Sequence, residues 1–484
     1  MSDCSSTTVA STSMSPPAVS KLSWADIEED ETPSTTTSDS NKLLADLNVK
    51  DLSINDDPKS LDDELDSTNI QAVTIGETAY TSAKRFEDLN LSEELLKGLY
   101  LSMKFERPSR IQAMTLPMIL SPPYKDLIAQ APNGSGKTIC FVLGMLSRVD
   151  LEVKAPQALC VVHTRELVHQ NVEVLKKMGK YTGITAESAL PDTLVVKNRE
   201  QITAQVIIGT TGTLKRLVSF GKLSLNHMKI LVFDEADHML AGDGFRDDSM
   251  RIMNDIKRKG KKCQVLLFSA TFNDQVKDFI ARTMQDYNQL FVKREELPLD
   301  TVKQYKVNCP DESAKVQVIK DKVLELGEKV GQTIIFVGSR DSAGRLHKAL
   351  VDLGYEVTTI QGALTLEDRD KIIKEFKDGL TKVLISTNML ARGFDQAQVN
   401  LVINYDIPFK HDHPSDPDYE VYLHRVGRAG RFGRNGAVFN LLSHDREYKL
   451  MQKIEDYFKI KTTEVLSWNS EDDFRAALKE AKLL

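Results

Sequence analysis

The sequence predicts an α/β protein with two parallel-sheet domains joined by a short linker. Continuous apolar runs such as Leu127–Ala129 and Ile230–Phe233 recur along the chain, separated by stretches of helical periodicity. That alternation is typical of a parallel sheet covered on both faces. The runs form two series, one on each side of the acidic, proline-containing stretch 295–300. A chain of 484 residues with 41% hydrophobic residues is long enough for two or three domains with real cores.

Four segments follow from these patterns: a tail over 1–83, a first α/β domain over 84–294, a linker over 295–300 and a second α/β domain over 301–484. The tail is rich in Ser, Thr and Asp and poor in large apolar residues, so we expect it to be mostly disordered. Residues 1–84 hold 16 acidic and 5 basic residues, a charge of −11, which leaves +4 of the overall −7 for the remainder. A mildly basic remainder permits a groove for phosphate groups.

Two stretches of the tail, around Trp24 and over Leu43–Leu47, are either incidental or short motifs. As a regulatory segment, so acidic a tail would compete with a nucleic acid for a basic surface. No apolar run approaches the roughly 18 residues of a membrane span, and the N-terminus lacks the apolar core of a signal peptide. The five cysteines are scattered without metal-type spacing, which indicates reduced thiols in a cytosolic or nuclear protein.

The stretch Ala131–Thr138, sequence APNGSGKT, has the context of a phosphate-binding loop. It follows the apolar run Leu127–Ala129 and precedes an apolar helical pattern, and in that context glycines let several backbone N–H groups face one anion. The lysine reaches the terminal phosphates, and the threonine hydroxyl can ligate Mg²⁺. We therefore expect a nucleotide to contact Asn133, Gly134, Ser135, Gly136, Lys137 and Thr138. The loop departs from the general pattern in opening with Ala131.

An adenine-binding segment is expected just before this loop. Pro108 can start a helix that holds Gln112 in its first turns, and a glutamine amide can bond both N6 and N7 of adenine. Phe105 can stack on the base. The signal is weak by itself and gains weight from the phosphate loop that follows.

Acidic residues follow the run Ile230–Phe233 in the sequence Asp-Glu-Ala-Asp. In parallel sheets ligands collect at the carboxyl ends of the strands, so Asp234 is expected to hold Mg²⁺ and Glu235 to polarise the attacking water. Asp237 is expected to bond to Ser269 or Thr271, in the polar stop after the next run, and to couple nucleotide state to the rest of the domain.

Small hydroxyl residues and glycines follow two further runs, at His163–Leu167 and Gly209–Thr213. Helix starts of this composition bind phosphate through backbone N–H groups. They are either ordinary helix caps or a second phosphate track for a nucleic-acid backbone.

The second series of runs has no phosphate loop, but arginines follow several of its runs, at Arg340, Arg369 and Arg392. The stretch His424–Arg434 also spaces arginines three apart, with glycines between them. If the second domain closes on the first, Arg428 and Arg431 become arginine fingers, an effect worth roughly 10³–10⁵ in rate in other phosphoryl-transfer systems.

The ordered motifs resemble those of the DEAD-box RNA helicases, from about Phe86 to the C-terminus. They are Gln112, the phosphate loop, Thr-Arg-Glu-Leu, Asp-Glu-Ala-Asp, Ser-Ala-Thr, Ala391–Asp395 and His-Arg-Val-Gly-Arg. The resemblance implies two tandem RecA-like domains, Asp395 at the ribose, and Arg428 and Arg431 at the γ-phosphate. It also implies that RNA is lined by Thr164, Arg165, Thr210, Gly212, Arg340, Gly362, Arg369 and Thr387.

Some positions depart from the family pattern. His163 stands in place of the usual proline, Thr213 in place of an arginine and Ala429 in place of a threonine, and no Gly-Gly pair occurs between Arg165 and Thr210. The nucleotide site therefore looks whole, while the RNA track of the first domain is altered.

Other stretches are similar to the messenger-RNA export helicases of the nuclear pore: Ser121–Pro123, Ala189–Asp192, Phe272 after Ser-Ala-Thr, and the long approach Ile407–Asp418. This resemblance implies a nucleoporin of the cytoplasmic filaments as partner, an export activator that uses inositol hexakisphosphate, and a location in the cytoplasm and at the cytoplasmic face of the pore, with shuttling through the nucleus. We expect a monomer that uses ATP and Mg²⁺ on single-stranded RNA. The alternatives are a general or translation-linked helicase of the same family, or an RNA clamp with little turnover.

Overall fold

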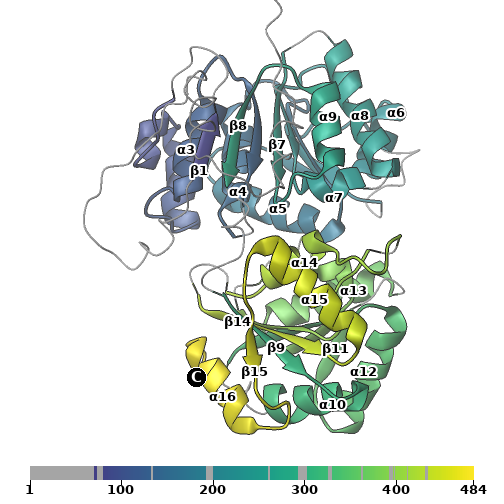
Figure 1. Cartoon of the computed structure of the whole chain (residues 1–484). Helices are drawn as coiled ribbons and strands as arrows, with labels where there is room; N and C mark the ends of the chain where they lie inside the picture. The colour runs from purple at the N-terminus through teal and green to yellow at the C-terminus, as the bar shows by residue number, and fades with distance from the viewer. Residues whose placement is uncertain are drawn as a thin grey trace, which may run out of the picture. The chain divides into compact units, whose positions relative to one another are not determined.

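The computed structural model describes residues 70–73, 80–131, 134–191, 200–241, 243–259, 262–292, 302–324, 330–360, 364–391, 396, 398–410, 412–430 and 434–484. These residues all belong to one compact unit. Within it the strands form two separate sheets, each flanked by helices (Figure 1). The α/β class with two sheets, predicted from the apolar runs, is confirmed.

The first sheet has eight strands in the order β1-β8-β2-β7-β6-β3-β5-β4. Only the edge strand β1 is antiparallel among them, pairing Ile70 with Val292 of β8. In chain order the strands are β1 (Ile70–Val73), β2 (Asp126–Gln130), β3 (Ala158–Val162), β4 (Ala186–Ala189), β5 (Val206–Thr210), β6 (Ile230–Phe233), β7 (Gln264–Ser269) and β8 (Tyr287–Val292).

The second sheet has seven strands in the order β11-β12-β10-β13-β14-β9-β15, and every pairing in it is parallel. The strands are β9 (Val302–Asn308), β10 (Gln332–Phe336), β11 (Val357–Ile360), β12 (Val383–Ser386), β13 (Val399–Asn404), β14 (Gly436–Leu442) and β15 (Thr463–Val465). Because parallel neighbours need crossover connections, helices alternate with strands along the chain.

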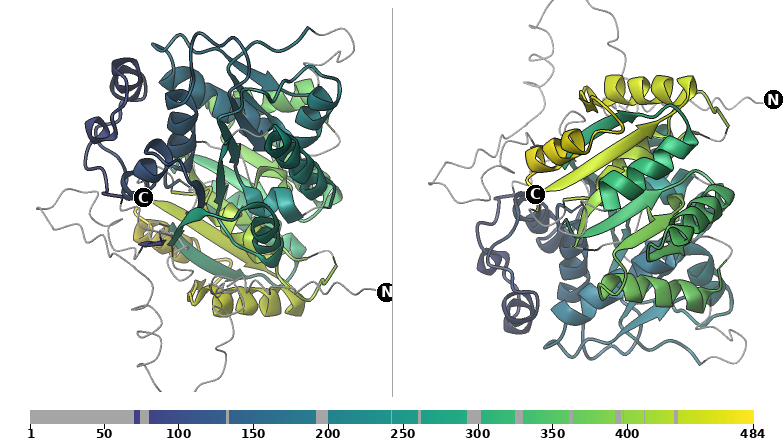
Figure 2. Two further views of the ribbon diagram at one scale, coloured as in Figure 1. Left: turned by 90° about the horizontal axis from the view of Figure 1, so that it is seen from above. Right: turned by 90° about the horizontal axis from the view of Figure 1, so that it is seen from below.

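The helices of the first part are η3 (Phe86–Leu89), α2 (Glu93–Lys97), η4 (Gly98–Ser102), α3 (Arg110–Leu120), α4 (Lys137–Ser147), α5 (Arg165–Met178), α6 (Thr211–Ser219), α7 (Ala236–Ala241), α8 (Asp243–Arg258) and α9 (Asp274–Thr283). Those of the second part are α10 (Glu312–Gln317), η6 (Val318–Leu324), α12 (Arg340–Asp352), α13 (Leu366–Lys377), η7 (Asn388–Leu390), α14 (Tyr419–Val426), α15 (Asp445–Phe458) and α16 (Glu471–Glu480). In Figures 1 and 2, α16 lies beside β15 at the yellow end of the colour bar, in agreement with its contacts.

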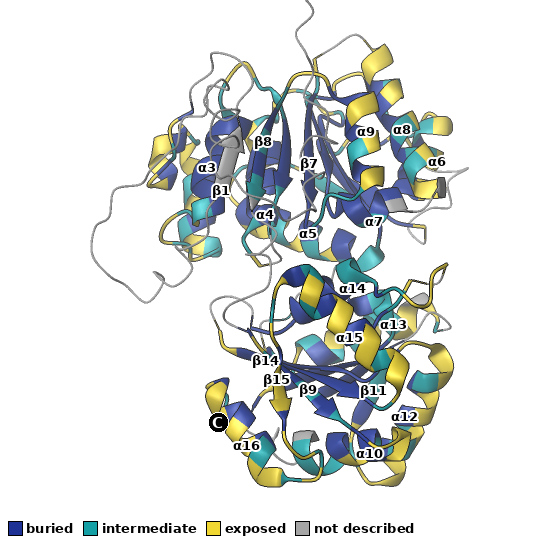
Figure 3. Ribbon diagram, viewed as in Figure 1, coloured by how far each residue is buried: buried dark blue, intermediate teal, exposed yellow. Residues whose placement is uncertain are grey.

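The central strands of each sheet are buried on both faces, as the unbroken apolar runs predict. Successive residues of β3 alternate between two cores: Cys160 belongs to one cluster, while Leu159 and Val161 belong to the other. In β10, Ile335 and Ile334 divide in the same way between the two cores of the second sheet. Figure 3 shows the result as dark blue strands under helices whose outer faces are exposed. Burial of both faces fixes the register, because a one-residue slip would exchange the two cores.

The structure departs from the sequence expectation at the start of the first sheet. Residues 70–73, predicted as part of a disordered tail, form the edge strand β1. Tyr80 and Ala83 are buried in the first core, and the Ala83 N–H donates to the carbonyl of Ala113 at 3.0 Å. The described first core therefore begins before residue 84. Edge strands of four residues carry too little pattern to be seen against a polar background.

The leucines around residues 89–100 also fold less regularly than their spacing predicts. The segment breaks into the 3₁₀ turn η3, the short α2 and the π-helical turn η4. Asn90, with φ at 51°, ends η3 in the left-handed region. Leu95 and Leu99 are nevertheless buried, so the predicted apolar face is present.

Several expectations fall outside the described residues: the linker 295–300 and the tail stretches at Trp24 and Leu43–Leu47. Four of the five cysteines are described, and all four are free thiols. Over the described residues, no helix combines the length and the apolar character needed to cross a bilayer.

Candidate nucleotide and RNA site

The phosphate loop joins β2 to α4, as its sequence predicts. Gly134 and Gly136 have φ angles of 81° and 93°, in the left-handed region that favours glycine. A Cβ on Gly136 would lie 2.4 Å from Nε2 of Gln112, so a side chain here would displace the end of Gln112. Pro132 and Asn133 lie outside the described residues.

Lys137 opens α4 and is buried, and its Nζ donates to the carbonyl of Ala131 at 2.6 Å. This bond folds the lysine back across the loop. Thr138 follows in the first turn, where the backbone N–H groups of a helix have no intrahelical acceptor. Ser135 Oγ is buried and makes no hydrogen bond within the described chain. The loop thus offers donors and an orphaned hydroxyl to an anion, which fits a nucleotide phosphate.

Gln112, in the first turn of α3, contacts this loop directly. Its Oε1 accepts from the backbone N–H of Ser109 at 2.9 Å, and its Nε2 donates to the carbonyl of Gly136 at 3.4 Å. Ser109 Oγ in turn donates to the carbonyl of Ser135 at 3.1 Å. The start of α3 is therefore tied to the phosphate loop. Phe105 is half-buried and packs against Phe86 of the first core, with ring centroids 6.4 Å apart.

Asp234 and Glu235 follow β6 at the carboxyl edge of the first sheet. Asp234 is buried, and its carboxylate accepts from Asn171 Nδ2 at 3.3 Å and from the Glu235 N–H at 3.0 Å. Burial raises the pKa of Asp234 to about 7, the Glu235 carboxylate adds to the rise, and the Lys137 ammonium opposes it. The two buried carboxylates and the Thr138 hydroxyl are hard oxygen donors of the kind that Mg²⁺ takes.

Asn171 is a site residue that the sequence expectations missed. It is fully buried on α5, one turn after Leu167 and one turn before Leu175, on the face that packs into the core. A polar residue in the middle of an apolar helical stripe is the signal that would have indicated it. Its amide holds Asp234 in place.

Asp237 makes the hydrogen bonds that were expected of it. Its N–H donates to Ser269 Oγ at 3.2 Å, and its Oδ2 accepts from the N–H and hydroxyl of Thr271 at 3.2 and 2.8 Å. His424 Nε2, on α14, lies 3.5 Å from the same Oδ2, and both side chains are fully buried. Asp237 therefore joins the end of β7 to α14, the helix that precedes Arg428. Its coupling role stays a prediction.

The expected RNA residues of the first sheet lie past the ends of β3 and β5. Thr164 caps α5, its Oγ1 accepting from the Leu167 N–H at 3.2 Å. Thr210 ends β5 and its hydroxyl donates to Thr213 at 3.0 Å, while Gly212 lies in the first turn of α6 with open space where a side chain would be. Arg165 begins α5, and its NH2 contacts Asp370 Oδ2 on α13 at 3.0 Å.

The expected RNA residues of the second sheet also follow strand ends. Arg340 is exposed at the start of α12, Thr387 comes directly after β12, and Arg369 is half-buried in the first turn of α13. Gly362, after β11, lies outside the described residues. Because carboxyl ends of parallel strands share one edge of a sheet, Arg340 and Thr387 lie at the same edge.

Arg428 is buried after α14, and its Nε donates to the carbonyl of His424 at 3.1 Å. The preceding Arg425 is fully buried and bonds Asn404, the Asp406 carbonyl and Asn388 at 3.0, 2.7 and 2.6 Å. Burial lowers the pKa of Arg425 to about 10. The His-Arg-Val-Gly-Arg stretch is thus fixed to β13 and η7. Asp395 and Arg431 lie outside the described residues.

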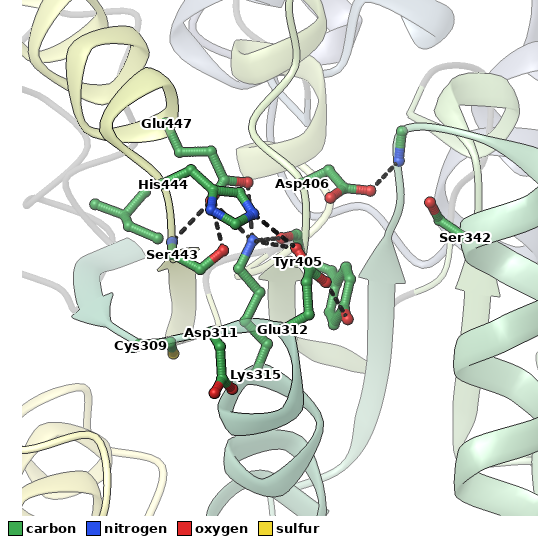
Figure 4. A network of polar contacts seen from close by, with 12 residues as sticks. Cys309, Asp311, Glu312, Lys315, Ser342, Tyr405, Asp406, Ser443, His444 and Glu447 are labelled. Carbon is green, nitrogen blue, oxygen red and sulfur yellow. Dashed lines mark hydrogen bonds and ion pairs between the residues drawn. The ribbon is translucent and has the colours of Figure 1, made fainter.

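A polar network behind this stretch holds the end of β13 (Figure 4). Lys315 is fully buried, and its Nζ donates to Glu447 at 2.8 Å and to the Tyr405 carbonyl at 2.9 Å. The next residue, Asp406, accepts from the Gly338 N–H at 2.6 Å, just before the helix that begins with Arg340. No motif in the sequence predicts this network, because its members are far apart in the chain.

Two parallel sheets of this kind, with a phosphate loop and acidic residues at the carboxyl edge of the first, define a two-domain RecA-like nucleotide-hydrolysing protein. Residues 109–279 match the model of the DEAD/DEAH box helicases, and residues 314–433 match that of the helicase conserved C-terminal domain. The chain belongs to the DEAD-box ATP-dependent RNA helicases.

Among its relatives is the DEAD-box ATP-dependent RNA helicase 38 of Arabidopsis thaliana, 61% identical over 91% of this chain and 90% of that protein. The structure is similar to Saccharomyces cerevisiae Dbp5 bound to RNA and ADP BeF3, with a TM-score of 0.77 and 38% identity over 82% of this chain and 100% of that one. It is also similar to a Dbp5 variant bound to Nup159, a Gle1 variant, IP6 and ADP, with a TM-score of 0.60 and 36% identity over 81% of this chain and 100% of that one.

Proposed function

We propose that this ATP-dependent RNA helicase remodels messenger ribonucleoprotein during export through the nuclear pore. The observation that supports this most is the likeness to Dbp5 over nearly the whole described chain, including a Dbp5 complex that contains Nup159, Gle1 and IP6. The sequence stretch Ile407–Asp418 adds to the argument, because it resembles the export subgroup. A filament nucleoporin and an activator that uses inositol hexakisphosphate are then its partners, and the protein works as a monomer at the cytoplasmic face of the pore.

The chemistry starts from the first sheet. Lys137 and the N–H groups of the loop bind the phosphates of ATP, while Gln112 exchanges its bond to Gly136 for one to adenine. Thr138 and Asp234 hold Mg²⁺, which neutralises charge on the phosphates when bound. Glu235 orients the attacking water.

The second sheet completes the site. Arg428 and Arg431 meet the γ-phosphoryl group, where guanidinium groups stabilise the charge of the transition state. Asp395 contacts the ribose. Because His424 touches Asp237 at 3.5 Å, the bonds around Asp237 connect the nucleotide to the second sheet.

RNA contacts both sheets, through Thr164, Arg165, Thr210 and Gly212 on the first and through Arg340, Gly362, Arg369 and Thr387 on the second. These groups address phosphate and sugar, so sequence preference is low. ATP and RNA favour the same arrangement of the two sheets, and each therefore raises the affinity for the other.

Glu235→Gln tests the assigned chemistry. We expect ATP and RNA to bind, turnover to fall by about 10²-fold or more because a general base is lost, and the variant to stay on RNA in the presence of ATP. Steady-state ATPase rates and RNA binding by fluorescence anisotropy measure both. Normal turnover in this variant would remove Glu235 from its role.

The export proposal is tested separately, by RNA-stimulated ATPase with and without the activator and inositol hexakisphosphate, and by pull-down with the N-terminal domain of the nucleoporin. Stimulation and capture support export. RNA-stimulated turnover with neither response indicates a general or translation-linked helicase, and RNA binding with hardly any turnover indicates a clamp.

A further inference from the structure

The ends of β3 and β6 bring a histidine to Glu235. The two strands are parallel neighbours, with Val161 opposite Phe233, so the residues that follow them leave the sheet side by side. His163 follows β3, and its Nε2 lies 3.8 Å from Oε2 of Glu235. The side chains of the two residues are 2% and 8% exposed. This contact is therefore sheltered from bulk water.

A second histidine holds the first in place. The ring of His238, on α7, packs on the ring of His163 with centroids 3.9 Å apart and an interplanar angle of 42°. The backbone N–H of His238 donates to the carbonyl of Glu235 at 3.2 Å. The two tilted rings and Glu235 thus form one small unit, in which the backbone of His238 is bonded to that of Glu235 and its ring contacts the ring of His163.

Glu235 needs such support more than an ordinary glutamate. Its φ of 52° lies in the left-handed region, which is uncommon for a residue with a side chain and persists where surrounding structure imposes it. Its Oε2 is buried and accepts no hydrogen bond within the described chain. The backbone sets the direction of the side chain, but no hydrogen bond within the described chain restrains Oε2.

We propose that His163, held by His238, is a positioning residue for the Glu235 carboxylate in ATP hydrolysis. The inference rests on the role proposed above for Glu235. An Nε2–H group 3.8 Å from Oε2 is too distant for a hydrogen bond but close enough to attract the carboxylate electrostatically. That attraction favours the orientation in which the other oxygen meets the attacking water, the general arrangement in which a base is oriented by a third group. The proline usual at this position in the family has no side-chain donor, so this histidine contact is a departure from the family pattern.

The test compares His163→Ala with His163→Gln in RNA-stimulated ATPase. A glutamine amide places an N–H near the position of Nε2, whereas alanine removes it. We expect His163→Ala to lower kcat about tenfold, because a misplaced catalytic group loses rate steeply, with KM for ATP changed less than about twofold. His163→Gln should recover most of kcat. The kcat of His238→Ala should lie between those of His163→Ala and wild type, since this change loosens the His163 ring without removing its donor.

The exposed His227 supplies the control, because His227→Ala changes the same residue type away from the site and leaves both constants unchanged. In a double-mutant cycle, adding His163→Ala to Glu235→Gln causes no further loss if His163 acts through Glu235. Unchanged kcat in His163→Ala, equal losses in the alanine and glutamine variants, or additive losses in the cycle would each overturn the inference. If the role proposed for Glu235 itself is wrong, the Glu235→Gln variant alone should show normal turnover, which distinguishes the two failures.

Discussion

Individual positions of the phosphate loop leave little space for a larger side chain, as Gly136 shows. Its left-handed φ favours glycine, and a Cβ there would force Nε2 of Gln112, 2.4 Å away, to move. The sequence motif predicts the glycine, but it does not predict that Gln112 occupies the space beside it. Nearby, Asn171 supports Asp234 from α5, one to two turns beyond the motif residues that begin that helix. At the residue scale, the motif residues were predictable and the residues that orient them were not.

Gly136→Ala should damage nucleotide binding more than folding. A methyl group there collides with Gln112 and forces the loop out of the left-handed region, so we expect KM for ATP to rise by about tenfold or more, since a displaced loop no longer directs its N–H groups at the phosphates. Steady-state ATPase against ATP concentration measures it.

Gly183→Ala is the matched control for that substitution. Gly183 has a φ of 71° but no atom within 4 Å of an added Cβ, so the change carries the backbone cost of about 1 kcal/mol without the collision. It should lower stability slightly and leave KM for ATP unchanged. Equal effects of the two changes on KM would contradict the steric account.

At the scale of elements, helices are placed by polar contacts as well as by their apolar faces. Figure 4 shows α10 joined to α15 by Lys315 and Glu447, next to Tyr405 at the end of β13. Glu447 also accepts from the Ser443 N–H at 2.8 Å, before the first turn of α15. This network fixes the segment whose carbonyl, at Asp406, holds Arg425. It therefore supports the arginine stretch without contacting substrate.

Glu447→Ala should destabilise the chain by about 3–5 kcal/mol, because it leaves the fully buried Lys315 without its main counter-charge. Chemical denaturation of the full chain measures the loss. Replacing both residues, as Lys315→Met with Glu447→Leu, should recover much of it, since an apolar pair of similar volume carries no buried charge.

Asp416→Ala is the control, because the ion pair that it breaks is made to the same helix, α15. Asp416 pairs with Lys453 of α15 at 2.7 Å, and both side chains are 46% exposed. Exposed pairs contribute about 0–1 kcal/mol, so this variant should remain close to wild type. A loss as large as that of Glu447→Ala would mean that burial is not the cause.

At the scale of the whole molecule, polar contacts between described residues join the first-sheet residues to the second-sheet residues. Besides His424 with Asp237, Asn273 Nδ2 donates to Glu420 at 2.8 Å and Arg165 contacts Asp370 at 3.0 Å. Arg165 is expected to bind an RNA phosphate, so the Asp370 carboxylate and that phosphate would compete for the same guanidinium group. RNA affinity and the arrangement of the two sheets are then linked through one arginine.

Asp370→Asn should strengthen RNA binding by about two- to fivefold at low salt, because it removes a competing negative charge beside Arg165. Fluorescence anisotropy with a short single-stranded RNA measures the change, which should shrink as salt is raised. Asp378→Asn, at the exposed C-terminal end of the same α13, makes an equal charge change away from Arg165 and should have a smaller effect. Weaker binding in Asp370→Asn would show that the contact favours the RNA-bound arrangement.

The sequence by itself determined the fold class, several buried strands of both sheets, the phosphate loop and the acidic residues after β6, but it did not predict β14, which is buried at every position. These features are local: an apolar run of a few residues, or a motif on one turn, carries its own signal. Edge strands such as β1 and β4 and the half-exposed β9 were missed, because four polar-flanked residues or mixed burial leave no period to read.

Only the tertiary structure decided which distant residues meet. Asn171 at Asp234, His163 at Glu235 and at His238, and Lys315 at Glu447 join segments separated by tens to more than a hundred positions. Such pairs depend on the strand order, which places β3 beside β6, and on helix packing, neither of which any short stretch encodes. The reacting groups lie in motifs because they contact one substrate, whereas their supports lie wherever the fold brings a side chain close.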